Sequence, residues 1–160
     1  MNSSPLEISD VENEFEAVLY LHHFHSGPNV NQETVLKLNG NDGFGALVVQ
    51  DWRCRAGRGF DTEVIARAQG IHVQASNEGA GSWYNSFNLV FVKDGFEGST
   101  LEVKGTNVTD GEWAIVGGTG KFTNAKGVIY KKKVDHFNDG DIMEITIKAT
   151  YSPMEKPKSA

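Results

Sequence analysis

The sequence of 160 residues is poor in the residues that cross-link or stiffen a small fold, with one cysteine and four prolines. The single cysteine, Cys54, excludes a disulfide within the chain. No stretch approaches the roughly 18 consecutive apolar residues of a membrane-spanning helix. The first residues, MNSSPLEISDVENEFE, lack the apolar segment of a secretory signal. We therefore expect a reduced, cytoplasmic protein that contacts no membrane.

Positive charge is also scarce. Lys and Arg number 15 against 21 Asp and Glu, which gives a net charge of −6. A protein that binds nucleic acid unaided needs a basic face, so no nucleic-acid partner is expected. The only basic run, Lys131–Lys133, is predicted to be the solvated edge of a strand.

Motifs of nucleotide binding and hydrolysis are missing as well. The glycine-rich run IVGGTGKFTNAKGVIY, residues 115–130, resembles a phosphate loop, but Ile115 and Phe122 occupy positions that require Gly and Ser or Thr. We interpret it as a turn between two strands, in which glycines supply positive φ and close backbone approach. His23 and His25 would share one face of a strand and His22 the other, which is too few ligands for a metal site. No catalytic residue, metal or cofactor is predicted.

Alternation of apolar and polar residues dominates the rest of the chain, and it predicts an all-β fold. Eight strands at short, even spacing indicate an eight-stranded antiparallel β-barrel, with an open sandwich as the alternative. Residues 1–13 are expected to form a disordered tail, residues 14–152 the barrel domain, and residues 153–160 a linker of the kind that leads to a further domain. The predicted strands are Phe15–His25, Phe44–Trp52, Thr62–Gln74, Ser82–Lys93, Ser99–Thr106, Gly111–Val116, Lys126–His136 and Asp141–Tyr151.

Three blocks of sequence carry a family resemblance. They are LYLHHFHSGPN at 19–29, the stretch from ARAQGIHV through SWYNSFNLVF to GSTLEVKG at 66–105, and VGGTGKFTNAKG at 116–127. In this order and spacing they resemble the plant dirigent proteins. The resemblance implies an eight-stranded antiparallel barrel similar to that of allene oxide cyclase, assembled as a homo-oligomer, a dimer or trimer.

At two positions this chain differs from the dirigent pattern that it resembles. Dirigent pockets rely on an Asp in a His-Asp pair and on an Arg in an Ala-Arg-Gly motif, and these positions hold His23 and Lys126 here. A neutral His accepts a proton but supplies no fixed negative charge, and Lys lacks the planar fork of Arg. The chain is similar to the dirigent half of grass proteins that fuse this domain to a jacalin-related lectin. A fused lectin domain is therefore an expected partner.

Two functions follow as hypotheses. The first is a non-catalytic binding module in plant defence or stress that recognises a carbohydrate, of galactose type, at the barrel mouth. The alternative is guidance of phenoxy-radical coupling or quinone-methide cyclisation of a phenolic small molecule. An oligomerising scaffold without ligand is a third. For a ligand site we predict one aromatic and polar set, although each member could equally be core or surface: His23, Asp51, Trp52, Trp83, Tyr84 and Lys126.

Overall fold

The computed structural model describes residues 12–38, 40, 43–78, 82–107, 110–152 and 154. Their regular structure consists of nine β-strands and one short 3-10 helix. The strands are β1 (Asn13–Phe24), β2 (Gln32–Leu36), β3 (Leu47–Arg55), β4 (Val64–Gln74), β5 (Trp83–Phe91), β6 (Thr100–Thr106), β7 (Glu112–Thr119), β8 (Lys126–Phe137) and β9 (Gly140–Tyr151), and the helix η1 is Gly120–Phe122.

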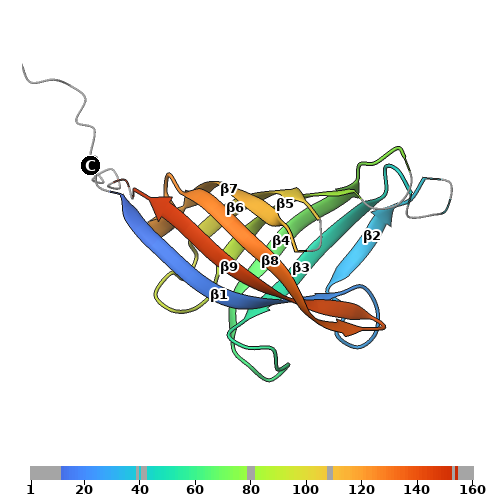
Figure 1. Ribbon diagram of the computed structural model, residues 1–160, viewed down its shortest axis with the longest axis horizontal. Helices are drawn as coiled ribbons and strands as arrows, with labels where there is room; N and C mark the ends of the chain where they lie inside the picture. Colours follow the sequence, from blue (N-terminus) through green and yellow to red (C-terminus); the bar gives the residue numbers. More distant parts are fainter. Residues whose placement is uncertain are drawn as a thin grey trace, which may run out of the picture.

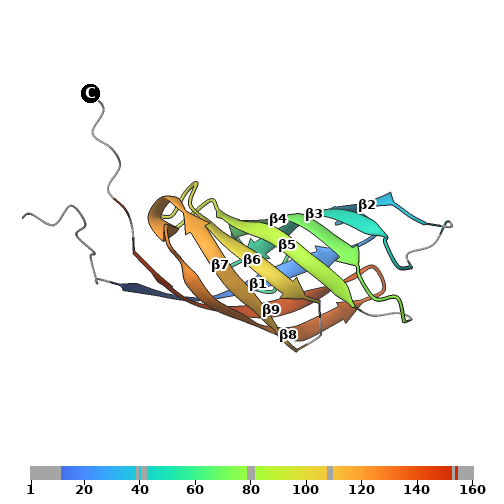
Figure 2. The ribbon, with the colours of Figure 1, turned by 90° about the horizontal axis from the view of Figure 1, so that it is seen from above.

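The strands form one antiparallel sheet in the order β1-β9-β8-β7-β6-β5-β4-β3-β2. A second pairing, between β1 and β3, closes eight of them into a barrel and leaves β2 as an added strand on β3 (Figures 1 and 2). The predicted eight-stranded barrel is therefore confirmed. Closure removes most of the unpaired edge that an open sheet would expose.

The closing seam is short. It pairs only Tyr20, Leu21 and His22 with Arg55, Cys54 and Arg53, respectively. Beyond it the Asn31 side chain accepts from the Phe24 amide at 3.0 Å and donates to the His22 carbonyl at 2.7 Å. The Asn31 carbonyl accepts from the Asp51 amide of β3 at 2.9 Å. Asn31 thus continues the link between β1 and β3 where regular pairing ends.

The two ends of the barrel differ. At the end where β7 finishes and β8 begins, which we call the closed end, phenylalanine rings fill the interior. Phe96 and Phe122 stack at 4.7 Å between centroids, and Phe15 meets both edge-on. At the other end, where β4 and β6 finish and β5 and β7 begin, the interior is lined by polar side chains. We call this the open end.

Several local predictions need correction. β2 was not expected, and the second predicted strand, Phe44–Trp52, lies instead at Leu47–Arg55. Trp52, predicted as the last residue of that strand, lies within β3 and is fully buried. Lys131 is not on a solvated edge, because its side chain points into the barrel and is only 4% exposed. The glycine-rich run does turn between β7 and β8, with Gly120 at φ +64°.

The domain prediction extends past the described part of the chain. The strands span Asn13 to Tyr151, while most of the predicted tail and linker lies outside the described residues. Among the residues that the structure describes, no helix has the length and apolar character needed to cross a membrane.

Candidate functional site

A cavity of about 490 Å³ occupies the open end of the barrel. Eight of its ten lining residues carry polar side chains, and only Val48 and Trp83 are apolar. The polar ones come from several elements: His23 from β1, Gln32 from β2, His72 from β4 and Asn107 from the residue after β6. The cavity therefore offers hydrogen-bonding groups on most sides, with an indole on one wall.

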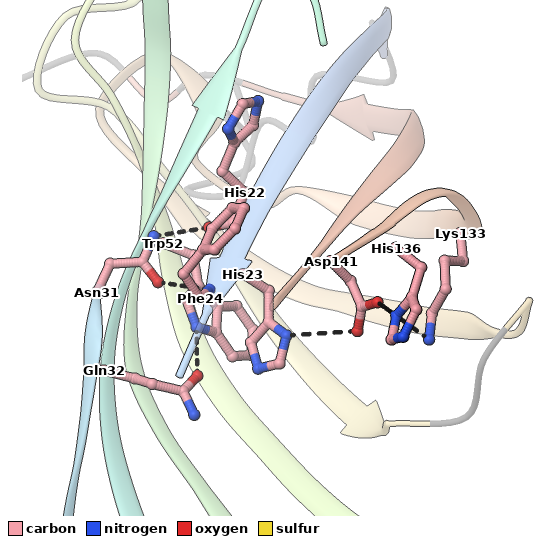
Figure 3. A network of polar contacts seen from close by, with 9 residues as sticks. All are labelled: His22, His23, Phe24, Asn31, Gln32, Trp52, Lys133, His136 and Asp141. Carbon is pink, nitrogen blue, oxygen red and sulfur yellow. Dashed lines mark hydrogen bonds and ion pairs between the residues drawn. The ribbon is translucent and has the colours of Figure 1, made fainter. Parts of the chain in front are cut away.

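Trp52 organises the wall of this cavity from behind. Its buried indole lies 5.2 Å from the ring of His23 and 5.3 Å from that of His72, and His72 is 5.1 Å from Trp83. The Trp52 Nε1–H donates to Gln32 Oε1 at 2.9 Å, which anchors β2 to the barrel (Figure 3). Four rings from four strands thus form one continuous row. Rings packed in this way can present faces and edges to a flat ligand.

His23 is neutral at physiological pH. Burial lowers its pKa from the usual 6.5 to about 4; the charge of Asp141 acts in the opposite direction but does not compensate. Burial also lowers the pKa of His72 to about 4, and the nearby His23 contributes. A neutral imidazole has one nitrogen that accepts a proton. The cavity therefore contains two proton acceptors that stay uncharged in the absence of ligand.

An acidic group lies beside His23 at the rim. Asp141, the first residue after Gly140 in β9, is the cross-strand partner of His23. Its Oδ2 lies 3.9 Å from His23 Nδ1, and its Oδ1 contacts His136 Nδ1 at 2.6 Å and Lys133 Nζ at 3.3 Å (Figure 3). Burial opposes ionisation, yet the hydrogen bond from His136 and the charge of Lys133 lower the pKa of Asp141. The carboxylate is therefore ionised.

Deeper in the barrel, polar side chains lie among the core. His72 Nδ1 lies 2.6 Å from Gln50 Oε1, and because that oxygen only accepts, the ring nitrogen carries the proton. Gln50 Nε2 and Asn85 Oδ1 are buried without a hydrogen-bond partner. Buried polar atoms usually have partners, so these two are unusual for a core.

Lys131 is a buried cation in the barrel interior. Its Nζ donates to the Thr106 carbonyl at 3.0 Å and lies 4.2 Å from the centre of the Trp113 ring. Burial lowers its pKa to about 8. An uncharged fraction of this amine is therefore present near neutral pH.

The structure brings together three of the six predicted site residues. His23 and Trp83 line the cavity, and Trp52 packs behind its wall. Tyr84 points to the opposite face of β5 and is 38% exposed, as expected when neighbours alternate along a strand.

Asp51 and Lys126 also lie elsewhere. Asp51 is on the outer face of β3, where it accepts from Arg67 Nε at 2.9 Å. Lys126 begins β8 at the closed end and pairs with Glu12 at 3.0 Å. Along β9 its cross-strand partner is Thr150 and that of His23 is Asp141, nine residues apart, or about 30 Å of strand. Asp51, Tyr84 and Lys126 thus lie outside the cavity.

Some site residues were not predicted from sequence. His72 lies on the inner face of a predicted strand, so its alternation phase could have found it. Gln32 lies on the unpredicted β2, and the position of Asp141 against His23 requires the β1–β9 register. Among the described residues, no group of three or more His, Cys, Asp or Glu side chains is placed to hold a metal ion.

Comparison with known proteins identifies the family of this barrel. A family model described as "Dirigent-like protein" matches residues 15–150. The chain belongs to the dirigent family. Pterocarpan synthase 1 of Glycyrrhiza echinata is 32% identical over 149 residues, which is 86% of this chain and 78% of that protein. A solved structure of a pterocarpan synthase dirigent protein has a TM-score of 0.82 at 29% identity and covers 95% of this chain and 92% of its own.

Other dirigent relatives match over a smaller part of their length. Dirigent protein 21 of Arabidopsis thaliana is 32% identical over 120 residues, or 72% of this chain and 59% of the relative. The chain thus spans less than two thirds of that dirigent protein. The expected lectin fusion, the oligomeric state and the cytoplasmic location stay predictions.

Proposed function

We propose that this dirigent barrel binds a phenolic small molecule in its open-end cavity and guides a quinone-methide cyclisation. The similarity to pterocarpan synthases supports this reaction class over the carbohydrate hypothesis. In such a reaction a phenol loses its proton and a benzylic hydroxyl leaves as water. A second phenolic oxygen then adds to the exocyclic carbon and restores the first phenol. One water is lost, and no electron enters or leaves.

The observation that carries the proposal is the neutral His23 at the wall of an open cavity, backed by Trp52. An imidazole whose accepting nitrogen faces a bound phenol can take its proton and return it to the leaving hydroxyl. The row of rings holds the flat substrate, so that the second phenol attacks one face of the exocyclic carbon. Stereocontrol then comes from positioning.

The test is turnover of a racemic phenol that carries a benzylic alcohol and a second phenol placed to close a ring, followed by chiral chromatography. We expect faster ring closure than in buffer and an excess of one enantiomer. His23→Gln should slow closure about 100-fold, a typical contribution of acid–base catalysis. Lys126→Ala, at the closed end, is the matched control and should leave the rate unchanged. Buffer-level rates with a racemic product would reject the proposal.

The polar lining favours carbohydrate recognition as a second candidate. Gln32, Thr34 and Asn107 surround the Trp83 wall, and sugar sites combine an aromatic face with groups that bond hydroxyls. Titration calorimetry with methyl galactosides and glucosides would test this. Saturable heats that disappear in Trp83→Ala and persist in Lys126→Ala would support a lectin-like module, and no heat with any sugar would exclude it.

A single substitution separates the two candidates. In His23→Asp, a second carboxylate would lie close to Asp141, and the like charge would raise the pKa of one of the two, which then holds a proton more readily. The pair would then supply an acid to the leaving hydroxyl, so cyclisation should be faster. Sugar affinity should be unchanged or weaker, because binding hydroxyls needs no proton transfer. Slower cyclisation would speak against the proposed reaction.

A further inference from the structure

The rim of the cavity holds an ionic cluster that includes a candidate proton acceptor. Asp141 lies at its centre, with His23 on β1 to one side and Lys133 and His136 on β8 to the other (Figure 3). The side chains of His23 and Asp141 are 18% and 19% exposed, so both are largely shielded from water. Charges in such a place interact more strongly than on an open surface.

The two oxygens of Asp141 are used differently. Lys133 and His136 both contact Oδ1, at 3.3 Å and 2.6 Å, and hold the carboxylate from the β8 side. Oδ2 faces His23 Nδ1 at 3.9 Å. The direct cross-strand pairing of His23 with Asp141 fixes the two side chains opposite each other. The β1–β9 register therefore determines that Oδ2 lies beside the imidazole.

We propose that Asp141 is the positioning residue for His23, which it holds in place and stabilises electrostatically when the imidazole takes a proton from a ligand hydroxyl. The use of this pair in a reaction rests on the proposed function. In that step the ligand O–H bond breaks, an N–H bond forms on His23, and the ligand oxygen becomes an anion. The proton later passes to the leaving hydroxyl, which departs as water, and His23 returns to its neutral form.

Other groups around His23 also shift the equilibrium between its neutral and protonated forms. Lys133 on β8 and His25, the residue after β1, both disfavour the imidazolium, while the Gln32 side chain on β2 favours it through a hydrogen bond. His72 on β4 is coupled to His23 as well. Asp141 is the carboxylate that opposes this positive surrounding. Removing it would leave Lys133 beside the imidazole without its counter-charge.

The test is a titration of the histidine ring protons by NMR on the full chain without any ligand. We expect the His23 pKa, about 4 in the unchanged protein, to fall by at least about half a unit in Asp141→Asn, and Asp141→Glu to restore it in part. In Lys133→Met the His23 pKa should rise, because a repelling cation is lost. Lys132→Met, the exposed neighbour, is the control and should change nothing.

The Lys133→Met arm keeps the test informative if Asp141→Asn does not fold. An unchanged His23 titration in Asp141→Asn, or a fall in Lys133→Met, would overturn the pairing whatever the turnover assay gives. The expected shifts together with a failed cyclisation assay would reject the proposed reaction and leave the pairing in place. With turnover present, Asp141→Asn should lower kcat much more than it changes KM, because Asp141 acts on the proton acceptor.

Discussion

Period-two alternation determines, at the scale of single residues, which side chains enter the barrel. It correctly separates Trp83 from Tyr84 and places His23 with the inner face. It fails for Lys131 because a lysine run is ordinarily interpreted as solvated surface. Lys131 continues the inward phase of Ile129 along β8, so alternation pointed inward while residue type pointed outward. The Lys131 side chain follows the strand alternation and is buried, and this burial lowers the pKa of its amine.

The first prediction concerns the stability that is lost by burying the Lys131 amine. The Lys131 pKa is lowered by burial to about 8, against about 10.4 in an unfolded chain. Burial of the charged amine therefore destabilises the fold in full below pH 8. The free energy of unfolding is regained as the pH rises from about 8 to 10.4. Lys131→Met should raise the free energy of unfolding at pH 7 by about 2 kcal/mol. The Thr106 carbonyl keeps a donor in this variant, because Trp113 Nε1 also bonds it at 3.1 Å.

Urea unfolding at pH 7 and at pH 9.5 measures this effect. The difference between Lys131→Met and the unchanged protein should shrink at the higher pH, where the folded amine is neutral and part of the stability lost to its burial has been regained. Lys132→Met, on the exposed side of the same strand, should show no such pH-dependent gain. A loss of stability in Lys131→Met at pH 7 would mean that the contact with the Trp113 ring outweighs the burial of the charge.

At the scale of elements, strands with one buried face were predicted and the strand without one was missed. β2 has no fully buried side chain among its five residues, so the hydrophobic signal that reveals a strand is absent. Its position depends on pairing with β3 and on the bond from Trp52 to Gln32. Since Gln32 and Thr34 line the cavity, the part of the site on β2 could not be predicted from sequence.

The second prediction concerns the seam between β1 and β3. Asn31→Ala removes both side-chain hydrogen bonds that continue the three-residue pairing. Two partly buried backbone groups, the Phe24 N–H and the His22 C=O, lose these partners. We expect a loss of about 2 kcal/mol in the free energy of unfolding. The Phe24 amide should also exchange its hydrogen faster under native conditions.

Asn88→Ala is the matched control for the seam, because Asn88 is exposed on the outer face of β5. Its stability and the exchange at Phe24 should stay as in the unchanged protein. Equal stability of Asn31→Ala and Asn88→Ala would show that the barrel closes without the Asn31 bridge.

At the scale of the whole molecule, the barrel has one end filled with phenylalanine rings and one end lined mostly by polar side chains. The count and spacing of strands predicted a closed barrel because closure alone removes the edges of an eight-stranded meander. They could not tell which end would be open. That depends on the register, which gathers Phe15, Phe96 and Phe122 at one end and His23 and His72 at the other.

The histidines at the open end make the stability of the whole barrel dependent on pH. His23 and His72 have folded pKa values of about 4 against the usual 6.5. Their neutral forms are favoured by the fold, so this stability is complete above pH 6.5 and is lost as the pH falls toward 4. Protonation of each histidine can lower the free energy of unfolding by up to about 3 kcal/mol between pH 6.5 and pH 4. Asp141, whose folded pKa lies below its usual value, acts at lower pH still.

The third prediction is therefore that the double variant His23→Gln/His72→Gln loses less stability than the unchanged protein between pH 7 and pH 4.5. Urea unfolding at several pH values measures the slope, and Asn88→Ala, exposed on the outer face of β5, serves as the control with an unaltered slope. Glutamine carries no charge, so folding no longer competes with protonation at these positions. Parallel slopes for the double variant and the unchanged protein would show that the open end admits enough water to solvate both imidazolium ions. His23 would then have a pKa near the usual 6.5 and be partly protonated at pH 7, so the fully neutral imidazole on which the proposed reaction rests would be absent.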